Sequence, residues 1–459
     1  MNKRVGSICL AAIMAISTIA MSGCKKGGSE TADVKTIKIW SVNGHTKEYD
    51  INRVEKFNNE IGKERGLKIE FKMITDANQM TELGMQTGDL PHLVDGSNLK
   101  TLVEKDIIIP ITDLPGGEEH IKKMGIEIPN NDECMYDGKI YSMPKNSGTR
   151  ALIYNKEMFV EAGLVDENGE AKPPKNLEEL REYAKKLTNP EEGKYGLILP
   201  FKWQTCLEDW LGMAQQINGF GSYNPKTGLY DFSAYEVILN TLMDIKNDGS
   251  ILPGSEGLDN DPARARFAEG GIGMKFAFYW DYGVLTTQFP AKIEWGVAPY
   301  PIENADGTRY KQKCGDGYRS RINKSVIEDI GAEDFMFFYE WWYSEESMGE
   351  LYAGGMDIPK SEKVAASVEF KDGEYVQWKE FGDLLEISHP EPIAMATEVS
   401  GNLKIQDDFL KSVWNGNESV ADFVKRKQEE YNAGIEAYQK MNPEYDPNVA
   451  LDPDWDISY

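Results

Sequence analysis

The chemically most informative segment is the run Phe278-Tyr279-Trp280-Asp281-Tyr282, the densest aromatic cluster of the 459 residues. The ring of a Trp or Tyr offers a flat apolar face on which a C–H-rich surface of a solute can stack. Carboxylate, amide and guanidinium groups can bind hydroxyl groups of the same solute. One net hydrogen bond contributes only about 0.5–1.5 kcal/mol, whereas micromolar binding needs about 8 kcal/mol. Several rings and polar groups must therefore converge on one site.

Loops that follow predicted strands supply further candidates for such a site. Asn43 and His45 come directly after the first predicted strand, at the carboxyl end where α/β sheets bind ligands. The candidates chosen by loop position are Asn43, His45, Asp95, Ser97, Asn98 and Trp203. Each has an alternative interpretation, because polar loop residues often form turns and a loop histidine is often only a surface residue.

No local motif of a known catalytic site is present in the sequence. Gly-x-Ser-x-Gly, His-Glu-x-x-His and a phosphate-binding glycine loop are absent. No Cys-x-x-Cys pair suggests zinc, and neither a metal nor a cofactor is expected. We therefore assign no catalytic residue. A secreted glycoside hydrolase stays open as an alternative, because a retaining enzyme needs two carboxyl groups about 5 Å apart and acidic residues are abundant.

The elements that position these loops follow a strand-helix-strand-helix-strand order near the N-terminus. Residues 36–41 and 67–73 are predicted strands, and the second alternates strictly between apolar and charged residues. Helical spacing covers residues 48–61 and 79–86, and Leu93-Val94 is a short third strand. This order is typical of a parallel α/β sheet.

The α/β pattern continues through the rest of the chain. Strands are predicted at 139–144 and 150–155. Asn176 is predicted to cap a helix, with Glu179 reaching back to the helix start. The C-terminal tail is predicted to be extended and to pack through Trp455. Further amphipathic helices are predicted at 210–217, 235–247, 262–269, 333–351 and 407–440.

The composition excludes some classes of partner. The chain has 76 acidic and 50 basic residues and a net charge of −26. Such a surface repels nucleic acid and anionic lipid, so we expect the protein to bind neither through its surface charge. The acidity also leaves open a binding protein for peptides or cationic solutes.

The N-terminus has the features of an export signal. Met1-Asn2-Lys3-Arg4 is cationic, an apolar run follows to about Met21, and Ser22-Gly23 precede Cys24. The apolar run is too short for a membrane-spanning helix. The last residues resemble a bacterial lipobox, with Met21 where Leu is usual. This resemblance implies a signal peptide over residues 1–23, followed by lipid-modified Cys24 and a flexible tether over residues 24–34. An ordinary signal with a free Cys24 thiol is the alternative.

Three further cysteines, Cys134, Cys206 and Cys314, are widely spaced. One disulfide with a spare thiol is possible in an exported protein. Three buried free thiols are the favoured interpretation.

Several sequence blocks occur in an order and spacing typical of one protein family. They are Trp40 with Asn43-Gly44-His45, residues 87–94 with His92 in place of the common Asp, 141–144, 151–159, 162–164, 173–175, 267–274 with Trp280, and 295–299. Together these blocks resemble the family 1 extracellular solute-binding lipoproteins of ABC importers, the carbohydrate-binding group that includes maltose-binding protein. The blocks span nearly all of the chain after the tether, and their shared order is more specific than any one of them.

The resemblance implies an α/β protein with a two-lobe, periplasmic-binding-protein-like fold, hinge crossings and a cleft between the lobes. The first lobe would contain residues 35–145 plus 319–352, and the second residues 146–315 plus 356–459. The chain would cross between the lobes near residues 144–148, 315–317 and 354–355. Glycines at two crossings suit places where backbone angles must change.

The resemblance also implies contacts with a ligand in the cleft. Trp280 matches the stacking position of the family, and Asp281 beside it would bind hydroxyls or cap a helix. Arg150 lies at a position close to the cleft, although pairing with a carboxylate is an equal alternative. The remaining implied contacts are Tyr318, Arg319 and Glu398.

The expected function is that of a lipid-anchored binding protein on the extracellular face of a bacterial cell membrane. It would capture a carbohydrate, in particular an oligosaccharide, by closure of the lobes and deliver it to ABC permease subunits. The expected protein is not an enzyme, is monomeric, and contacts the membrane only through its lipid.

Overall fold

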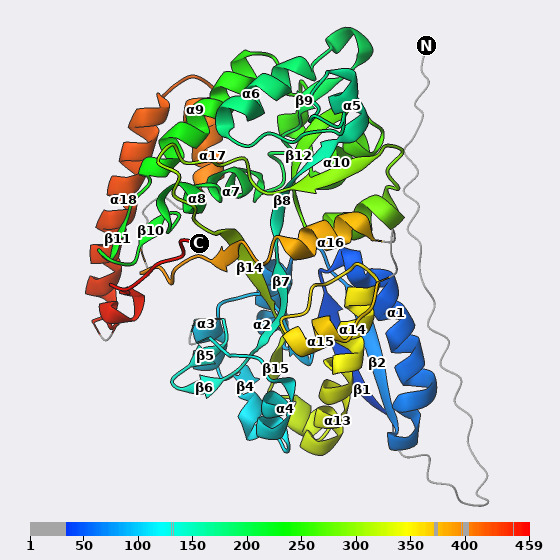
Figure 1. The fold of residues 1–459 in the computed structure, drawn as a ribbon. Helices are drawn as coiled ribbons and strands as arrows, with labels where there is room; N and C mark the ends of the chain where they lie inside the picture. The colour runs from blue at the N-terminus through cyan, green and yellow to red at the C-terminus, as the bar shows by residue number, and fades with distance from the viewer. Residues whose placement is uncertain are drawn as a thin grey trace, which may run out of the picture.

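The computed structural model describes residues 34–129, 131, 133–370, 375–395, 397, 404–443 and 445–459. The chain forms two lobes, each built from a sheet covered by helices, with β7 (Pro144–Gly148) and β14 (Gln312–Tyr318) running between them (Figure 1). The predicted two-lobe α/β fold is confirmed. The predicted signal peptide, Cys24, the tether up to residue 33 and Glu398 lie outside the described residues.

The first lobe contains a five-stranded sheet whose start is parallel, as predicted. Its strands, in spatial order, are β2 (Leu67–Met73), β1 (Lys35–Ser41), β3 (Leu93–Val94), β15 (Arg321–Asn323) and β4 (Ile108–Ile109). β1 pairs in parallel with both β2 and β3, whereas β15 is antiparallel to β3 and β4. Ile37 and Ile39 point into the core of this lobe with Leu67 and Ile69 from the neighbouring strand.

Helices and a short hairpin complete the first lobe. The helical elements are α1 (Lys47–Lys56), η2 (Phe57–Ile61), α2 (Ala77–Thr87), α3 (Leu99–Glu104), α4 (Gly117–Met124), α12 (Val326–Asp329), α13 (Ala332–Trp342), α14 (Glu345–Ala353) and α15 (Glu362–Ala366). The hairpin strands are β5 (Met135–Tyr136) and β6 (Lys139–Ile140). Phe335, Phe338 and Tyr339 of α13 are fully buried and belong to the core of this lobe.

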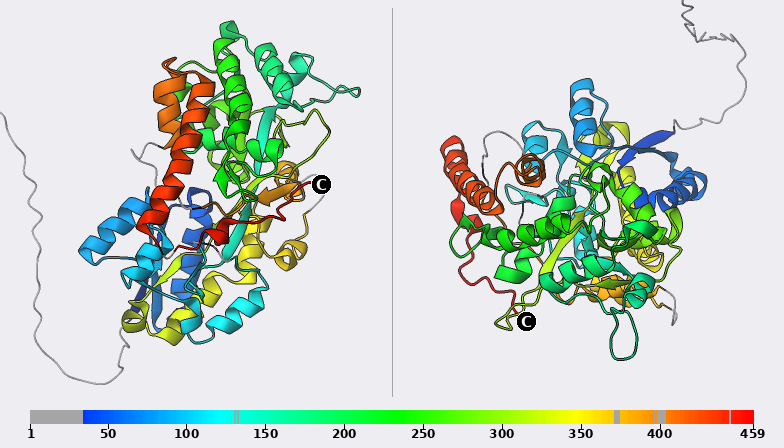
Figure 2. Two further views of the ribbon diagram at one scale, coloured as in Figure 1. Left: turned by 90° about the vertical axis from the view of Figure 1, so that its left-hand side faces the viewer. Right: turned by 90° about the horizontal axis from the view of Figure 1, so that it is seen from above.

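The second lobe contains a four-stranded sheet with its most buried strands in the middle. The spatial order is β13 (Trp295–Ala298), β8 (Arg150–Asn155), β12 (Ile272–Phe278) and β9 (Tyr195–Leu197). All residues of β8 and β12 are buried, because helices cover both faces of the sheet (Figures 1 and 2). In strands covered on both faces, nearly every residue is buried, whereas buried and exposed residues alternate in strands covered on one face.

The second lobe is mostly helical outside its sheet. Its helices are α5 (Lys156–Glu161), α6 (Leu177–Lys186), α7 (Cys206–Leu211), α8 (Ala214–Asn218), α9 (Ser233–Asn247), α10 (Asn260–Ala268), α11 (Asp281–Gly283), α16 (Val376–Asp383), α17 (Ile405–Phe409) and α18 (Val420–Met441), with a hairpin of β10 (Tyr223–Asn224) and β11 (Leu229–Tyr230). Asn176 caps α6 as predicted, accepting a bond from the backbone N–H of Glu179 at 2.9 Å. The C-terminal tail runs along this lobe, and Trp455 Nε1 donates to the carbonyl of Gly219.

Three predicted helices are too long, because each is interrupted. The predicted helix 210–217 is divided at Gly212-Met213 between α7 and α8. The predicted helix 333–351 ends at Trp342, and Ser344 caps a new helix by accepting from Ser347 N–H. The predicted helix 407–440 is also interrupted, and Ser419 caps α18 in the same way. Each serine satisfies a free N–H group at a helix start, which favours a new helix over continuation of the old one.

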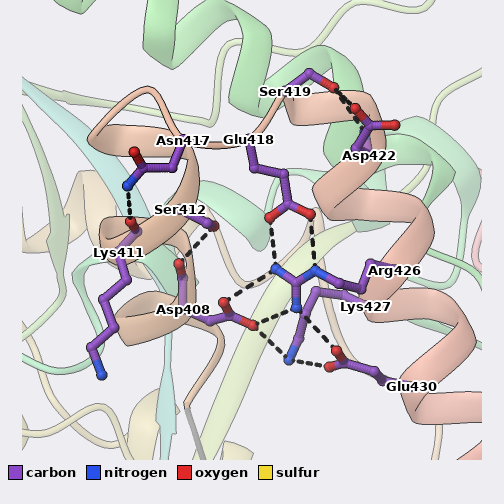
Figure 3. A network of polar contacts seen from close by, with 10 residues as sticks. All are labelled: Asp408, Lys411, Ser412, Asn417, Glu418, Ser419, Asp422, Arg426, Lys427 and Glu430. Carbon is purple, nitrogen blue, oxygen red and sulfur yellow. Dashed lines mark hydrogen bonds and ion pairs between the residues drawn. The ribbon is translucent and has the colours of Figure 1, made fainter.

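A charge network attaches the segment before α18 to that helix (Figure 3). Arg426 donates to both carboxylate oxygens of Glu418, at 2.9 and 2.7 Å, and to Asp408 and Glu430 at 2.9 and 3.0 Å. Buried Lys427 pairs with the last two carboxylates. Hydrogen bonds to these carboxylates raise the pKa of Arg426. The network holds η8 (Leu410–Trp414) and the following turn against α18.

The hinge consists of three chain segments lying side by side. β7 and β14 pair antiparallel, and the backbone N–H of Ser147 donates to the carbonyl of Ile358 on the third segment at 2.9 Å. β14 also pairs with β16 (Ser388–Pro390). A Cβ at Gly317 would lie 1.9 Å from Asn146 Oδ1, so any larger residue there would have to displace the Asn146 side chain.

After the third crossing, the chain still contributes residues to the first lobe beyond the boundary that the sequence predicts. Val364 of α15 packs in the first-lobe core, although the sequence places everything after Met356 in the second lobe. Ile358 and Trp378 pack instead in a cluster with second-lobe residues. The segment from Ile358 to Trp378 therefore contacts the second lobe, then the first, then the second again.

Cys134, Cys206 and Cys314 are buried free thiols, as favoured from the sequence. Among the described residues no helix is long and apolar enough to cross a bilayer. The same part of the chain contains no group of three or more His, Cys, Asp or Glu side chains placed to hold a metal ion.

Buried His120 on α4 should make the protein less stable in mild acid. Arg319 Nη1 lies 2.7 Å from His120 Nε2, which must accept, so the ring is neutral in this contact. Burial, followed by the charges of Arg319 and Lys123, lowers the pKa of His120 to about 4. The unfolded chain binds this proton near pH 6.5, so the free energy of unfolding should fall by about 3 kcal/mol as the pH drops from 6.5 through 4.

Denaturant unfolding at a series of pH values tests this expectation. His120→Gln keeps an acceptor for Arg319 but does not titrate. Its stability should therefore depend less on pH between 6.5 and 4 than that of the wild-type protein. Parallel pH profiles for the two proteins would contradict the assigned role of His120.

Candidate functional site

The loops of both lobes meet at the hinge because of strand direction. Tyr318 ends hinge strand β14, and Arg321 three residues later pairs with Val94, the last residue of β3. The carboxyl ends of β3 and its parallel neighbour β1 therefore lie beside the hinge. In the second lobe, Phe278 at the end of β12 pairs with Arg150, which lies two residues after the end of hinge strand β7. The loops after β1, β3 and β12 thus approach the same region, as expected for a ligand site in α/β folds.

An aromatic stack forms the second-lobe side of this region. The ring of Trp280 lies parallel to that of Phe278, with centroids 4.3 Å apart and an interplanar angle of 10°. The guanidinium of Arg150 lies 4.3 Å from the centroid of Phe278, and the ring of Trp203 contacts Phe278 edge-on, with centroids 5.8 Å apart. Trp280 itself is only half-buried. The stack therefore fixes one indole whose surface is still partly exposed, which suits stacking with a C–H-rich solute.

A buried carboxylate joins the first and third crossings. Asp357 Oδ1 accepts hydrogen bonds from Asn146 Nδ2 at 2.7 Å and from the Tyr279 hydroxyl at 2.9 Å. Lys145 Nζ lies 3.2 Å from its Oδ2. Burial alone would raise the pKa of Asp357, but Lys145 and His45 outweigh it and hold the pKa well below its usual range. The carboxylate is therefore ionised at neutral pH.

His45 lies between the two sides of the site. Its loop, η1 (Gly44–Thr46), follows β1 in the first lobe. Its Nε2 is 3.2 Å from Asp357 Oδ1, and its ring centroid is 6.1 Å from that of Trp280. Since the carboxylate of Asp357 is ionised and can only accept, His45 must donate from Nε2.

A narrow pocket of about 70 Å³ opens on the first-lobe side. Its lining includes three sequence-predicted residues, Asn43, Asp95 and Tyr318, together with Asp50 and Lys145. Burial raises the pKa of Asp95 and of Asp50, and it raises the pKa of Tyr318 to about 12. Burial alone would lower the pKa of Lys145, but Asp357 and the two pocket carboxylates outweigh it. The pocket thus presents hydroxyl, amide and carboxylate groups around one ammonium.

Other sequence-predicted residues have structural partners. Arg150 is buried, and its Nη1 is 2.5 Å from Asp209 Oδ1. Burial raises the pKa of Asp209, and Arg150 opposes the rise. Asp281 has no exposed surface and pairs with Arg264 while accepting from the backbone N–H of Phe278. The structure thus places both side chains beneath the aromatic stack, where they hold it instead of facing a solute.

Three more predicted contacts lie away from the open part of the site. Asn98 caps α3, accepting from Thr101 N–H at 2.7 Å, and Ser97 is a turn residue with a φ of 59°. Arg319 is 2% exposed and stacks on Tyr343 within the first lobe. The positions of Ser97 and Asn98 agree with turn formation, the alternative that the sequence left open for them, whereas the sequence offered no alternative to ligand contact for Arg319.

The polar residues of the hinge were not among the predicted contacts. They are Lys145, Asn146, Tyr279 and Asp357. The first two lie in a predicted crossing, and Asp357 closely follows another. Their position in or near predicted crossings could have identified these residues, because polar residues at a crossing are candidates for a hinge site. The bond between Asn146 and Asp357 spans 211 residues and has no local pattern.

Two α/β lobes, three crossings and a polar and aromatic site at the hinge define a two-lobe binding protein. The chain belongs to the bacterial extracellular solute-binding proteins, whose family model matches residues 52–377. A binding protein of Brucella abortus is 26% identical over 210 residues, 45% of this chain and 48% of that protein. The maltotriose-binding protein of Pyrococcus abyssi is 27% identical over 175 residues, 38% of this chain and 34% of that protein. The chain thus spans about half or less of the length of these curated relatives.

Solved structures share the fold over nearly the whole described chain. An ABC substrate-binding protein of Listeria monocytogenes in complex with cycloalternan has a TM-score of 0.64 and 19% identity, covering 88% of this chain and 98% of that one. The maltose/maltodextrin-binding domain of Bdellovibrio bacteriovorus bound to maltotriose has a TM-score of 0.65 and 19% identity, covering 88% and 100%. At this identity the likeness establishes the fold.

Proposed function

We propose that the protein captures a carbohydrate, in particular an oligosaccharide, and delivers it to the permease of an ABC importer. The observation that carries this proposal is the half-buried indole of Trp280, held against Phe278 and close to polar groups of the opposite lobe. A sugar presents both a C–H face for the ring and hydroxyls for the polar groups. The sugars named for the two solved structures, cycloalternan and maltotriose, support the same class of solute.

The charges of the site favour an uncharged solute. Asp357 is paired with Lys145, and Asp209 with Arg150, so each of these buried carboxylates has a cationic partner. A charged solute that binds to one member of either pair would displace the other member, which costs free energy because a buried unpaired charge remains. Hydroxyl groups can add to these groups without changing the balance of charge.

Closure of the lobes is the proposed mechanism. A solute that contacts both lobes only when they are close together shifts the population toward the closed form. The permease would then recognise the closed form, and no covalent bond would change. We further propose that lipid on Cys24 anchors the mature protein, as a monomer, to the outer face of the cell membrane.

A thermal-shift screen against mono- and oligosaccharides tests the proposed function. A sugar present at 100 times its dissociation constant should stabilise the folded protein by about 2.7 kcal/mol and raise its unfolding temperature. Mass spectrometry of the mixture should recover the sugar intact. Cleavage of the sugar would support a glycoside hydrolase instead. Stabilisation by peptides or polyamines but by no sugar would support a binder of peptides or cations.

A further inference from the structure

His45 is a first-lobe side chain whose side-chain contacts lie on the opposite side of the site. Its backbone is in η1 after β1, the inner strand of the first-lobe sheet. Its Nε2 bonds to Asp357, and its ring lies 6.1 Å from Trp280. The side chain is 14% exposed, so it is held within the site and does not project into solvent.

Both partners of His45 are attached to the second lobe. Trp280 begins the loop after β12 and stacks on Phe278 of that strand. Asp357 accepts from the hydroxyl of Tyr279, and its neighbour Ile358 packs in a second-lobe cluster with Tyr279. A movement that separates the lobes would therefore carry Trp280 away from His45 and strain its bond to Asp357, which lies in the third crossing and is held to the second lobe through Tyr279.

We propose that His45 is a latch between the lobes. It connects them by direct side-chain contact, with no solute between, and so biases the hinge toward the closed form before any solute binds. A packed hinge with two discrete arrangements responds to one such contact as a shift in population. The proposal rests on the lobe motion of the proposed function, but not on the identity or class of the solute.

The latch also has a consequence for recognition. A solute that stacks on Trp280 must fit beside the imidazole or displace it. His45 thus differs from Asn43 and Asp95, because its ring lies beside Trp280, where a stacked solute would bind. Asn43 and Asp95, in contrast, line the first-lobe pocket and leave the lobes unconnected.

The test compares the wild-type protein with His45→Ala in the absence of sugar. We expect the ratio of closed to open molecules to fall about fivefold, which corresponds to about 1 kcal/mol at 1.4 kcal/mol per factor of ten. Small-angle scattering measures this as a larger radius of gyration. Amide hydrogen exchange of peptides around His45 and Trp280 detects the same shift when the open form is rare, since exchange should be about fivefold faster.

A matched control exists within the second lobe. His389 lies in β16 beside hinge strand β14, but its ring contacts Trp455 of the C-terminal tail edge-on at 5.2 Å, so His389→Ala also removes a histidine–tryptophan contact, and one that does not join the lobes. It should leave both measurements unchanged. His45→Phe provides a second variant, because it can keep the ring contact while losing the bond to Asp357, and should give a smaller shift than His45→Ala.

The latch is supported if either the radius of gyration or the exchange rate changes in His45→Ala but not in His389→Ala. The latch is overturned if neither scattering nor exchange changes in folded His45→Ala protein, or if His389→Ala produces the same change. Because no sugar is present, this result is independent of the thermal-shift screen. A failed screen with a positive latch test would remove the carbohydrate assignment and leave the hinge contact in place.

Discussion

Replacing Trp280 with alanine should weaken binding of the saccharide found in the thermal-shift screen by about 30-fold or more. Tryptophans at the centre of a binding site often contribute 2 kcal/mol or more, which corresponds to this factor. Phe278 stacks on the indole, and Arg150 lies over Phe278. Because these groups hold the indole in place, the loss of affinity should be larger than that for one unsupported ring. Isothermal titration calorimetry of the wild-type and variant proteins measures the change in affinity directly.

A second tryptophan of the same lobe serves as the control for this variant. Trp455 is also half-buried and contacts His389 and the carbonyl of Gly219, not the aromatic stack. Trp455→Ala should therefore keep the affinity even if it lowers stability. Unchanged affinity in folded Trp280→Ala protein would remove this residue from the binding site and with it the main support for a carbohydrate ligand.

Asp357→Asn should destabilise the protein by about 3–5 kcal/mol at neutral pH. The substitution keeps the shape of the side chain but leaves the ammonium of Lys145, whose side chain is only 18% exposed, without its closest negative partner, and an unpaired, largely buried charge has a cost of this size. The amide must also replace an acceptor for Asn146 and Tyr279. Thermal unfolding followed by calorimetry should show a markedly lower transition temperature.

The pH dependence of this effect has a definite sign. The folded-state pKa of Asp357 is depressed, so its contribution is fully present above the unfolded value of about 3.9 and is lost as the pH falls below it. The two proteins should therefore differ most near neutral pH and converge below about pH 4. A difference that stays constant down to pH 3 would show that the charge of Asp357 is not responsible.

Asp316→Asn is a matched control on the same hinge. Asp316 pairs with Lys360 at 2.9 Å, but Lys360 is 31% exposed and can return to water when its partner is removed. This substitution should cost about 1 kcal/mol or less. Equal losses for the two variants would contradict the view that burial of the Lys145 charge sets the cost.

Local patterns were sufficient to predict most of the fold. The alternating run 67–73 is β2 with the same ends, and the cap at Asn176 begins α6. Both depend on residues within a few positions of each other, where side-chain period and free N–H groups decide the structure. The predicted helices failed where a serine cap competes with continuation, as at Ser344, because two local preferences then favour different outcomes.

The candidate site was predictable only in part. Loop position drew attention to Asn43 and Asp95, which line the first-lobe pocket. It could not distinguish Arg319, a neighbour of the hinge that is buried against His120, from a residue open to solute. Burial and pairing depend on which distant segments meet, and one sequence does not contain that information in its local spacing. The same reason hid Asp357, whose partner Asn146 is 211 residues away.

The position of β15 has a consequence for how the protein is made. This strand completes the first-lobe sheet by pairing with both β3 and β4, yet it is synthesised after most of the second lobe. A nascent chain therefore leaves the ribosome with the edges of β3 and β4 unpaired until about residue 323 has emerged. Assembly of the N-terminal half must wait for distant sequence, so this half cannot fold first as an independent unit during translation. A chain terminated before Arg321 lacks β15 and the four first-lobe helices that follow it, so it should depend on chaperones and be sensitive to proteases.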